Sequence, residues 1–310
     1  MTASTETNLP DLLLLSKGKV RDIYSTSSPE HLLFVATDRI SAYDVILRNG
    51  IPGKGKLLTQ ISLFWFSKLS HIIPNHFITA NVQEMPEEVR KYEDQLDGRA
   101  MLVKKAKVLP LEAIVRGYLT GSAWSEYKES GTVHGITLPV GLVESQKLPE
   151  PLFTPSTKAE QGAHDENIPP EQASNLIGES LYTQISQAAL KLYTEAAEYA
   201  QSKGVILADT KFEFGLVPSA TSPNGETLIL VDELLTPDSS RYWPFQGYEA
   251  GKSQPSFDKQ YLRDWLVCSG FRKGLESGKE GEEGEGWNID SSVVEGTRER
   301  YEEAVKLLTS

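Results

Sequence analysis

The sequence predicts an α+β protein, with a strand-rich first part followed by a part that combines long helices with a hairpin. Short apolar runs separated by polar turns are typical of strands, and they dominate the first part of the chain. Apolar residues recur at helical spacing over 171–203, which indicates one long helix ended by Gly204. The apolar runs 205–215 and 227–232 then flank the turn sequence 223–225, which favours a hairpin.

The other expected elements follow from the same rules. Strands are expected over 12–25, 31–37, 44–47, 99–108 and 111–118, with a break at Pro110. Helices are expected over 56–73, 122–128, 257–268 and 292–308. Non-regular segments are a disordered tail over 1–10, a hinge at 104–110, a long loop over 139–170 and a mobile acidic loop over 273–286.

Size and composition indicate a globular protein in a reducing compartment. At 310 residues the chain is long enough for a large core and for two domains. Cys268 is the only cysteine, so an internal disulfide is excluded and the cytoplasm is the expected location. The apolar run at 12–15 is too short for a secretory signal or a membrane span.

The net charge of −12 is unevenly distributed along the chain. Residues 1–150 carry 17 basic and 17 acidic side chains, whereas residues 151–310 carry 14 and 26. This distribution argues against a nucleic-acid-binding protein, which needs a basic stripe. Most of the acidity is interpreted as a solubilising surface, and small anionic substrates remain compatible with local basic groups.

The stretch 207–215 carries the strongest chemical signal in the chain. As a strand it places Asp209, Lys211 and Glu213 on one face, in steps of roughly 6.5–7 Å, and apolar residues on the other. A row of charges on one strand face is costly unless a ligand uses it. This face is therefore a candidate site for a metal–phosphate substrate.

A second acidic pair follows the next apolar strand. Asp232 and Glu233 end the run that starts at Thr227, and in an antiparallel hairpin Asp232 returns toward Glu213. Two carboxylates from neighbouring strands suit Mg²⁺, which binds one or two protein carboxylates together with phosphate oxygens. The alternative is an exposed strand face whose charges are solvated.

Two further segments are candidate anion sites. The segment 236–241 combines hydroxyls, a Pro-Asp turn and an arginine, a set that can hold a phosphate, although a simple capped turn also explains it. The strand 111–118 places Arg116 beside the Gly121-Ser122 turn at a helix start. Structural pairing of Arg116 with Glu112 is the alternative interpretation.

Two glycine-containing segments invite a nucleotide-binding interpretation. The basic turn 18–24 can cover nucleotide phosphates with its cations and backbone N–H groups, although the pattern alone is weak. The segment 50–57 fits a P-loop as far as Lys56, but Leu57 stands where the motif needs Ser or Thr for Mg²⁺. A P-loop NTPase is therefore disfavoured, and the five histidines lack zinc-ligand spacing.

Taken together, these segments resemble one family, SAICAR synthetase of purine biosynthesis. They occur in the family's order, cover most of 15–265 and match the single-domain fungal form particularly well. The motifs are GKVRDIY at 18–24, TDRISAYD at 37–44, PLEAIVRGY at 110–118 with 121–122, FTPSTK at 153–158 with 164–167, DTKFEFG at 209–215, and 232–233 with TPDSSR at 236–241. The stretch 273–286 departs from the pattern.

The resemblance implies an ATP-dependent ligase that joins L-aspartate to carboxyaminoimidazole ribonucleotide (CAIR), giving SAICAR, ADP and phosphate through an acyl phosphate. It implies ATP and Mg²⁺ as cofactors and a kinase- and ATP-grasp-like α+β fold with ATP in a cleft between two lobes. The expected lobes are a β-rich, nucleotide-covering lobe over 11–108 and a larger substrate and metal lobe over 109–310. No nucleic acid or membrane partner is implied, and a monomer is expected.

The resemblance also assigns roles to single residues. Lys211 would bridge the substrate carboxylate and the transferring phosphate, and Asp209 would orient Lys211 or bind the aminoimidazole. Glu213 and Asp232 would hold Mg²⁺. The ATP-binding candidates are Lys19, Val20, Arg21, Lys104, Glu112, Glu213 and Asp232. The substrate-binding candidates are Arg116, Ser122, Ser240 and Arg241, together with Lys158, His164, Asp165 and the segment 38–44 for aspartate.

A non-catalytic relative that kept only the fold is the remaining alternative. Such a protein would have lost charged site residues. Because Lys211, Glu213, Asp232, Arg116 and Arg241 are all present, the sequence favours an active enzyme.

Overall fold

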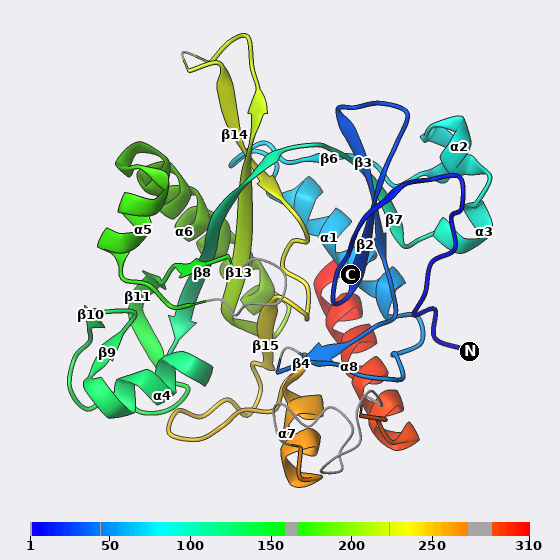
Figure 1. Ribbon diagram of the computed structural model, residues 1–310. Coiled ribbons are helices and arrows are strands. Elements are labelled where there is room, and N and C mark those ends of the chain that lie inside the picture. The colour runs from blue at the N-terminus through cyan, green and yellow to red at the C-terminus, as the bar shows by residue number, and fades with distance from the viewer. Residues whose placement is uncertain (1, 44, 159–165, 223, 272–286) are drawn as a thin grey trace, which may run out of the picture. The chain divides into compact units, whose positions relative to one another are not determined.

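A computed structural model describes residues 2–43, 45–158, 166–222, 224–271 and 287–310 (Figure 1). The fold is mixed α/β, and all of its paired strands run antiparallel within the described residues. The chain divides into two units. Unit 1 comprises Met1–Phe64, Phe77–Lys105 and Ser256–Ser310, and unit 2 comprises Trp65–His76 and Ala106–Pro255.

Unit 1 contains a five-stranded sheet in the order β1-β2-β3-β7-β6. These strands are β1 (Leu14–Lys17), β2 (Arg21–Ser25), β3 (His31–Ala36), β6 (Phe77–Thr79) and β7 (Ala100–Lys104). Three short helical turns connect β6 to β7, namely η1 (Val82–Glu84), α2 (Glu87–Arg90) and α3 (Glu93–Leu96). Their apolar residues, such as Val89 and Leu96, share a buried core with Leu33 and Val35 of β3.

The N-terminal segment packs on unit 1, which corrects the expectation of a disordered tail over 1–10. Leu9 is 4% exposed and belongs to the core beneath the sheet. The backbone N–H of Ser4 donates to Asp38 Oδ2 at 2.8 Å, and the Thr7 hydroxyl donates to Asp22 Oδ2 at 2.7 Å. Burial of the apolar side chain and these specific hydrogen bonds order the segment.

The C-terminal helices also belong to unit 1. The helices α7 (Gln260–Cys268) and α8 (Ser291–Thr309) pack on the segment that carries β4 (Ser41–Ala42) and β5 (Val45–Ile46). The Asn49 side chain bonds both backbone groups of Ile289, at 2.6 and 2.8 Å. Residues from 256 onward therefore group with unit 1, whereas the sequence-based division assigned all of 109–310 to one lobe. The helix α1 (Lys54–Lys68) starts in unit 1 and ends in unit 2.

Unit 2 is built on a six-stranded sheet whose centre is β13 (Val205–Pro218) (Figure 1). One edge of β13 pairs with β8 (Lys107–Tyr118), and the other pairs with β14 (Glu226–Val231) and β15 (Ser240–Pro244). The strands β11 (Lys147–Phe153) and β12 (Ser156–Thr157) pair with the far side of β8. The expected hairpin of β13 and β14 is thereby confirmed.

One face of this sheet is covered by α6 (Glu179–Ser202), which follows α5 (Pro170–Ile177). A Cβ atom on Gly117 would lie 1.9 Å from the Tyr193 hydroxyl, so the face toward which Gly117 points is the one that α6 covers. By strand alternation, Arg116 and Glu112 lie on the opposite face. Beyond β8, the chain continues into α4 (Gly121–Ser130) and the hairpin β9 (Thr132–Val133) and β10 (Ile136–Thr137).

Several sequence-based boundaries were wrong. Strand β8 continues through Pro110, because the register with β13 shifts between Glu213 and Gly215 and accommodates a residue without an N–H group. The expected loop 139–170 contains β11 and β12, which bury Leu148 and Phe153.

Two further corrections concern the second half of the chain. The single helix expected over 171–203 is interrupted at Gly178, whose φ of 89° is accessible mainly to glycine. Strand β15 was missed entirely, because its segment had been interpreted as a turn. Within the described residues no helix is long and apolar enough to cross a membrane.

Candidate active site

The face of the unit 2 sheet that points away from α6 carries a row of charged side chains. In the register of β8 and β13, Asp209 lies opposite Arg116, Lys211 opposite Ile114, and Glu213 opposite Glu112. Opposed residues of an antiparallel pair point to the same side. The predicted common face of Asp209, Lys211 and Glu213 is therefore confirmed, and Arg116 and Glu112 join it.

Lys211 stands between two carboxylates. Its ammonium contacts Glu112 Oε1 and lies 3.6 Å from Glu213 Oε1. Burial lowers the pKa of Lys211, but the charges of Glu112, Glu213 and Asp232 outweigh burial, so that the pKa is raised above its ordinary value. Lys211 is consequently an ammonium group at neutral pH, held in place from both sides.

A second lysine contacts one of these carboxylates from outside the central strands. Lys158 follows β12, and its ammonium contacts Glu213 Oε2. The Ser156 hydroxyl, two residues earlier, donates to Glu112 Oε2 at 3.3 Å. The segment after β11 therefore supplies partners for both acidic residues of the sheet.

Asp209 holds two guanidinium groups. Its Oδ2 lies 3.3 Å from Arg116 Nη1 and also contacts Arg241 Nη1. Arg116 additionally donates from Nε to the Thr154 hydroxyl at 3.0 Å. Burial lowers the pKa of Arg116 and Arg241 lowers it further, whereas Asp209 opposes the shift. The alternative interpretation paired Arg116 with Glu112, whereas the structure pairs it with Asp209. Asp209 was expected to orient Lys211 or to bind the aminoimidazole, and its ion pairs in the structure are with the two arginines.

The start of α4 lies against the same arginine pair. Gly121 has a φ of 58°, and a Cβ atom there would lie 2.5 Å from Arg241 Nη2. Glycine is needed at this position for both its backbone conformation and the close approach of the guanidinium group. Ser122, the next residue, is exposed. The structure thus brings together Arg116, Arg241 and Ser122, which two separate motifs had predicted.

Ser240 is the exception among the predicted substrate-binding residues. Its hydroxyl lies 2.8 Å from the Thr210 hydroxyl, and Thr210 is opposite Ser240 in the register of β13 and β15. Because Thr210 alternates with Asp209 and Lys211, the Ser240 side chain points away from the charged face. The prediction missed this orientation because it depends on a strand, β15, that the sequence did not indicate.

Glu213 and Asp232 have the chemistry of a magnesium site. Glu213 lies opposite Val231, and Asp232 follows directly, with a φ of 64°. No group of three or more His, Cys, Asp or Glu side chains that could hold a metal occurs in the part of the chain that the structure describes. Mg²⁺ needs only one or two protein carboxylates when phosphate and water complete its shell. The Lys158 ammonium on Glu213 Oε2 shows that this oxygen accepts a cation, so the carboxylate of Glu213 is compatible with Mg²⁺.

The predicted ATP-binding residues of unit 1 lie at the ends of its strands. The turn between β1 and β2 closes with a hydrogen bond of 2.8 Å from Gly18 N–H to the Arg21 carbonyl. Lys19 on this turn is exposed, whereas Arg21 is 8% exposed and stands over the Phe34 ring. Lys104 is exposed at the end of β7, where it pairs with His31 at the start of β3. Arg21 pairs with Ala36 at the other end of β3, so the register places Lys104 and the β1–β2 turn at opposite ends of the sheet.

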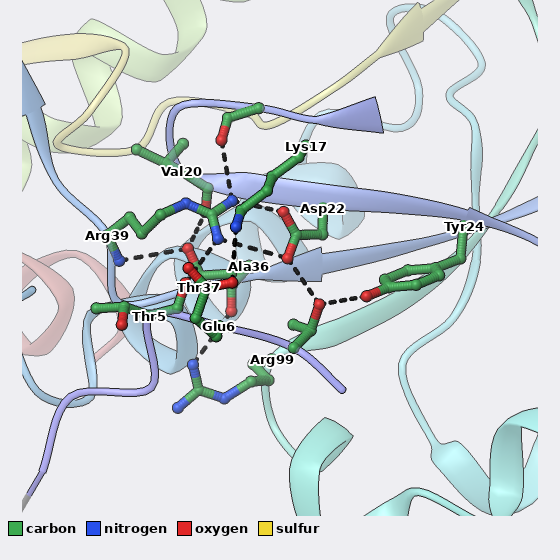
Figure 2. Close-up of polar contacts among 12 residues, drawn as sticks. Thr5, Glu6, Lys17, Val20, Asp22, Tyr24, Ala36, Thr37, Arg39 and Arg99 are labelled. Carbon is green, nitrogen blue, oxygen red and sulfur yellow. Dashed lines mark hydrogen bonds and ion pairs between the residues drawn. The ribbon is translucent and has the colours of Figure 1, made fainter. Parts of the chain in front are cut away.

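A buried ion pair between Arg39 and Asp22 contacts this turn, as Figure 2 shows. Arg39 Nη2 lies 2.6 Å from Asp22 Oδ1 and donates to the Gly18 carbonyl at 2.9 Å. The Thr37 N–H and hydroxyl both donate to the Val20 carbonyl at 2.9 Å. The motifs 18–24 and 37–44 therefore form one network within unit 1.

The P-loop alternative fails on the geometry of α1. The backbone N–H groups of Gly53 and Gly55 donate to the Asp38 carboxylate at 3.1 and 2.9 Å. Lys54 is fully buried, and its ammonium donates to the Arg39 carbonyl at 3.0 Å. A P-loop offers such groups to phosphate, whereas here a carboxylate of the same unit uses the backbone donors. Asp38 is itself 1% exposed, so it is not presented to aspartate in this structure.

Some predicted residues lie outside the described residues. These are His164, Asp165, Asp44 and the stretch 273–286. Conversely, sequence reasoning missed Thr154 and Ser156, which contact Arg116 and Glu112. The FTPSTK motif contained both residues, but only the register of β12 on β8 shows which partners they meet.

A buried sheet face with a fixed ammonium group, paired guanidinium groups and converging carboxylates defines an enzyme that acts on anionic substrates. The model of the SAICAR synthetase family matches residues 14–277. The chain is 54% identical to the phosphoribosylaminoimidazole-succinocarboxamide synthase of Maridesulfovibrio salexigens, over 98% of this chain and 96% of the relative. It is also 54% identical to that of Pichia angusta, over 98% and 97%.

Solved structures agree with these relatives. SAICAR synthase from Saccharomyces cerevisiae complexed with SAICAR has a TM-score of 0.85 and 48% identity, over 98% of this chain and 97% of that one. A type-2 SAICAR synthetase in complex with ADP has a TM-score of 0.65 and 25% identity, over 95% and 97%. The chain therefore belongs to the SAICAR synthetase family. It is an enzyme of the ligase class, and it joins L-aspartate to CAIR in purine biosynthesis.

Proposed function

We propose that this ligase uses ATP and Mg²⁺ to activate the CAIR carboxylate as an acyl phosphate. A carboxylate oxygen attacks the γ-phosphorus and ADP leaves; the aspartate amine then attacks the acyl carbon, loses a proton, and phosphate leaves. The observation that carries the proposal is the position of Lys211 between Glu112 and Glu213, beside the cluster of Arg116, Asp209 and Arg241. Relatives solved with SAICAR and with ADP support it.

Lys211 acts as a fixed positive charge. Because its pKa is raised, it stays protonated and does not serve as a base. An ammonium group that contacts both the carboxylate of CAIR and the transferring phosphoryl group offsets the repulsion between two anions. Glu112 and Glu213 keep it in position before the substrates arrive, so little reorganisation is required during the reaction.

Arg116, Arg241 and Ser122 bind the phosphate of the ribonucleotide. Two guanidinium groups at the start of a helix form a site suited to a phosphate dianion. Asp209 keeps the guanidinium groups side by side, because their mutual repulsion would otherwise separate them. Lys158 binds a substrate carboxylate, and Asp165 belongs to the same substrate site.

Glu213 and Asp232 hold Mg²⁺. When bound, the ion neutralises the phosphates of ATP and orients the γ-phosphoryl group. Lys19, Val20, Arg21 and Lys104 bind ATP together with Glu112. In this proposal the two units correspond to the lobes of a kinase- and ATP-grasp-like enzyme that works as a monomer in the cytoplasm.

The proposal is tested by following oxygen transfer. With oxygen-18 in the CAIR carboxylate, the acyl phosphate route transfers one labelled oxygen to the released phosphate, and ADP release with CAIR requires ATP and Mg²⁺. Unlabelled phosphate would exclude the acyl phosphate. ADP release that continues unchanged in the absence of aspartate would show that phosphoryl transfer is not coupled to ligation.

A further inference from the structure

The two oxygens of Glu213 have different cationic partners. Oε1 lies 3.6 Å from Lys211, which is also bound to Glu112, whereas Oε2 contacts Lys158. Lys211 therefore has two carboxylate partners on the sheet. For Lys158, Glu213 is the carboxylate partner that the described residues provide.

The two lysines differ in how firmly the backbone fixes them. Lys211 lies in the middle of β13, with β8 paired to the strand at this position. Lys158 lies beyond the end of β12, where its N–H donates to the Pro110 carbonyl at 3.2 Å. The two side chains are exposed to a similar extent, 36% for Lys158 and 33% for Lys211, so the difference lies in their backbone positions. A partly exposed lysine pair of this kind contributes little to stability. Lys158 can therefore leave Glu213 without disturbing the sheet.

The charge of the cluster favours such an exchange. Three acidic side chains, Glu112, Glu213 and Asp232, act on Lys211, and Lys158 and Lys211 are the two ammonium groups that contact them. A divalent cation in place of the Lys158 ammonium adds one positive charge beside these carboxylates. The ammonium group and a divalent cation cannot both occupy Glu213 Oε2, because they repel each other and compete for the same lone pairs.

We propose that Lys158 is an exchangeable counter-ion: it occupies Glu213 in the metal-free enzyme and moves to the carboxylate of a substrate when metal binds. The inference rests on the proposed function, in which Glu213 holds the metal. It links two binding events through one side chain. Metal binding releases the cation that the anionic substrate needs, and the metal-free enzyme keeps Lys158 occupied and binds that substrate weakly.

The experiment measures Mn²⁺ binding by electron paramagnetic resonance, in the presence of saturating ADP and without CAIR or aspartate. Lys158→Met removes the competing cation, so Mn²⁺ should bind about five-fold more tightly, whereas Lys158→Arg, which keeps the charge, should resemble the wild type. Lys147→Met, at an exposed lysine of β11, is the matched control. In steady-state assays, Lys158→Met should raise the KM for CAIR or aspartate about ten-fold with a smaller effect on kcat.

Glu213→Gln distinguishes a failure of the Lys158 exchange from a failure of the metal role of Glu213. If Glu213→Gln weakens Mn²⁺ binding while Lys158→Met leaves it unchanged or weaker, the exchange is wrong and the metal role of Glu213 stands. If Glu213→Gln binds Mn²⁺ as the wild type does, the metal role fails and the exchange fails with it. Circular dichroism and thermal melting of each variant establish that the comparison is between folded proteins.

Discussion

Glu112 on β8 and Glu213 on β13 lie directly opposite each other, and Lys211 contacts both. Two like charges at opposed positions of an antiparallel pair destabilise a sheet. The sheet tolerates them here because the Lys211 ammonium lies between the two carboxylates. Lys211 therefore balances charge within the sheet, in addition to the role toward the substrates that we propose for it.

Lys211→Met should reduce kcat/KM by about a thousand-fold, since it removes a charge aimed at the reacting anions. It should also lower the free energy of unfolding by about 1–2 kcal/mol, a figure reduced from that of a buried ion pair because Lys211 is one-third exposed. Steady-state kinetics and urea denaturation measure the two effects. Near-normal turnover in a folded variant would remove the role assigned to Lys211.

The stability difference has a predicted pH dependence. The pKa of Lys211 in the folded protein is above its unfolded value of about 10.4, so its contribution is fully present below that pH and is lost as the pH rises through the folded pKa. The difference between wild type and Lys211→Met should therefore be constant between about pH 6 and pH 9. A difference that grows steadily as the pH rises over this range would indicate a folded pKa below the unfolded value and would contradict the raised pKa.

Asp209→Asn should weaken ribonucleotide binding and destabilise the protein. It leaves the buried Arg116 without its anionic partner and allows Arg116 and Arg241 to repel each other. We expect a loss of about 3 kcal/mol in the free energy of unfolding and a raised KM for CAIR, measured by urea denaturation and initial rates. Glu249→Gln, which breaks the exposed pair with Lys252, is the control and should leave the denaturation midpoint unchanged. Equal denaturation midpoints for the two variants would show that the Asp209 carboxylate does not stabilise the fold.

The charged face was predictable because strand alternation is local. That Asp209, Lys211 and Glu213 share one face follows from the two-residue alternation of a strand, which does not depend on the neighbouring strands. The partners of these residues are set by register between strands that lie far apart in the sequence. The structural alternative for Arg116 was therefore a pair with Glu112, which is close in sequence, and the pair with Asp209 across the sheet was not predicted.

The missed elements have equally specific causes. Pro149 and Pro151 made 147–153 look like a loop, yet proline is compatible with a strand at the edge of a sheet, which is where β11 lies. The side of the sheet to which Ser240 points depends on β15, whose first two residues were grouped with the turn sequence 236–241. Gly178 interrupts a continuous helical pattern because of its backbone conformation, which apolar spacing does not report.

Gly117→Ala should destabilise the protein by about 2–3 kcal/mol, because the new Cβ would lie 1.9 Å from the Tyr193 hydroxyl in a packed interior. Tyr193→Phe should cost about 1–2 kcal/mol, since the hydroxyl donates to the Leu207 carbonyl at 2.6 Å. Combined, the two changes should cost less than their sum by about 1 kcal/mol, because the hydroxyl that clashes is gone. The relief is partial, as a ring carbon of residue 193 remains 2.8 Å from the new Cβ. Additive losses in urea denaturation would contradict this contact.

His134 should make the protein less stable at acid pH. Burial lowers its pKa and Arg116 lowers it further, against the opposing effect of a 2.8 Å contact between Nδ1 and the Pro155 carbonyl. A histidine with a depressed folded pKa binds a proton more readily in the unfolded chain, so stability falls as the pH drops below the unfolded pKa of about 6.5.

His134→Asn tests this effect, since asparagine tolerates the φ of 48° at this position. The variant should be less stable than the wild type at pH 7.5, because the contact with Pro155 is altered. Between pH 7.5 and pH 5.5 it should lose about 0.5–1 kcal/mol less than the wild type does, measured by urea denaturation at each pH. Circular dichroism at pH 5.5 shows whether both proteins are still folded there. Parallel losses in the two proteins would mean that His134 takes up its proton equally well in the folded and unfolded states.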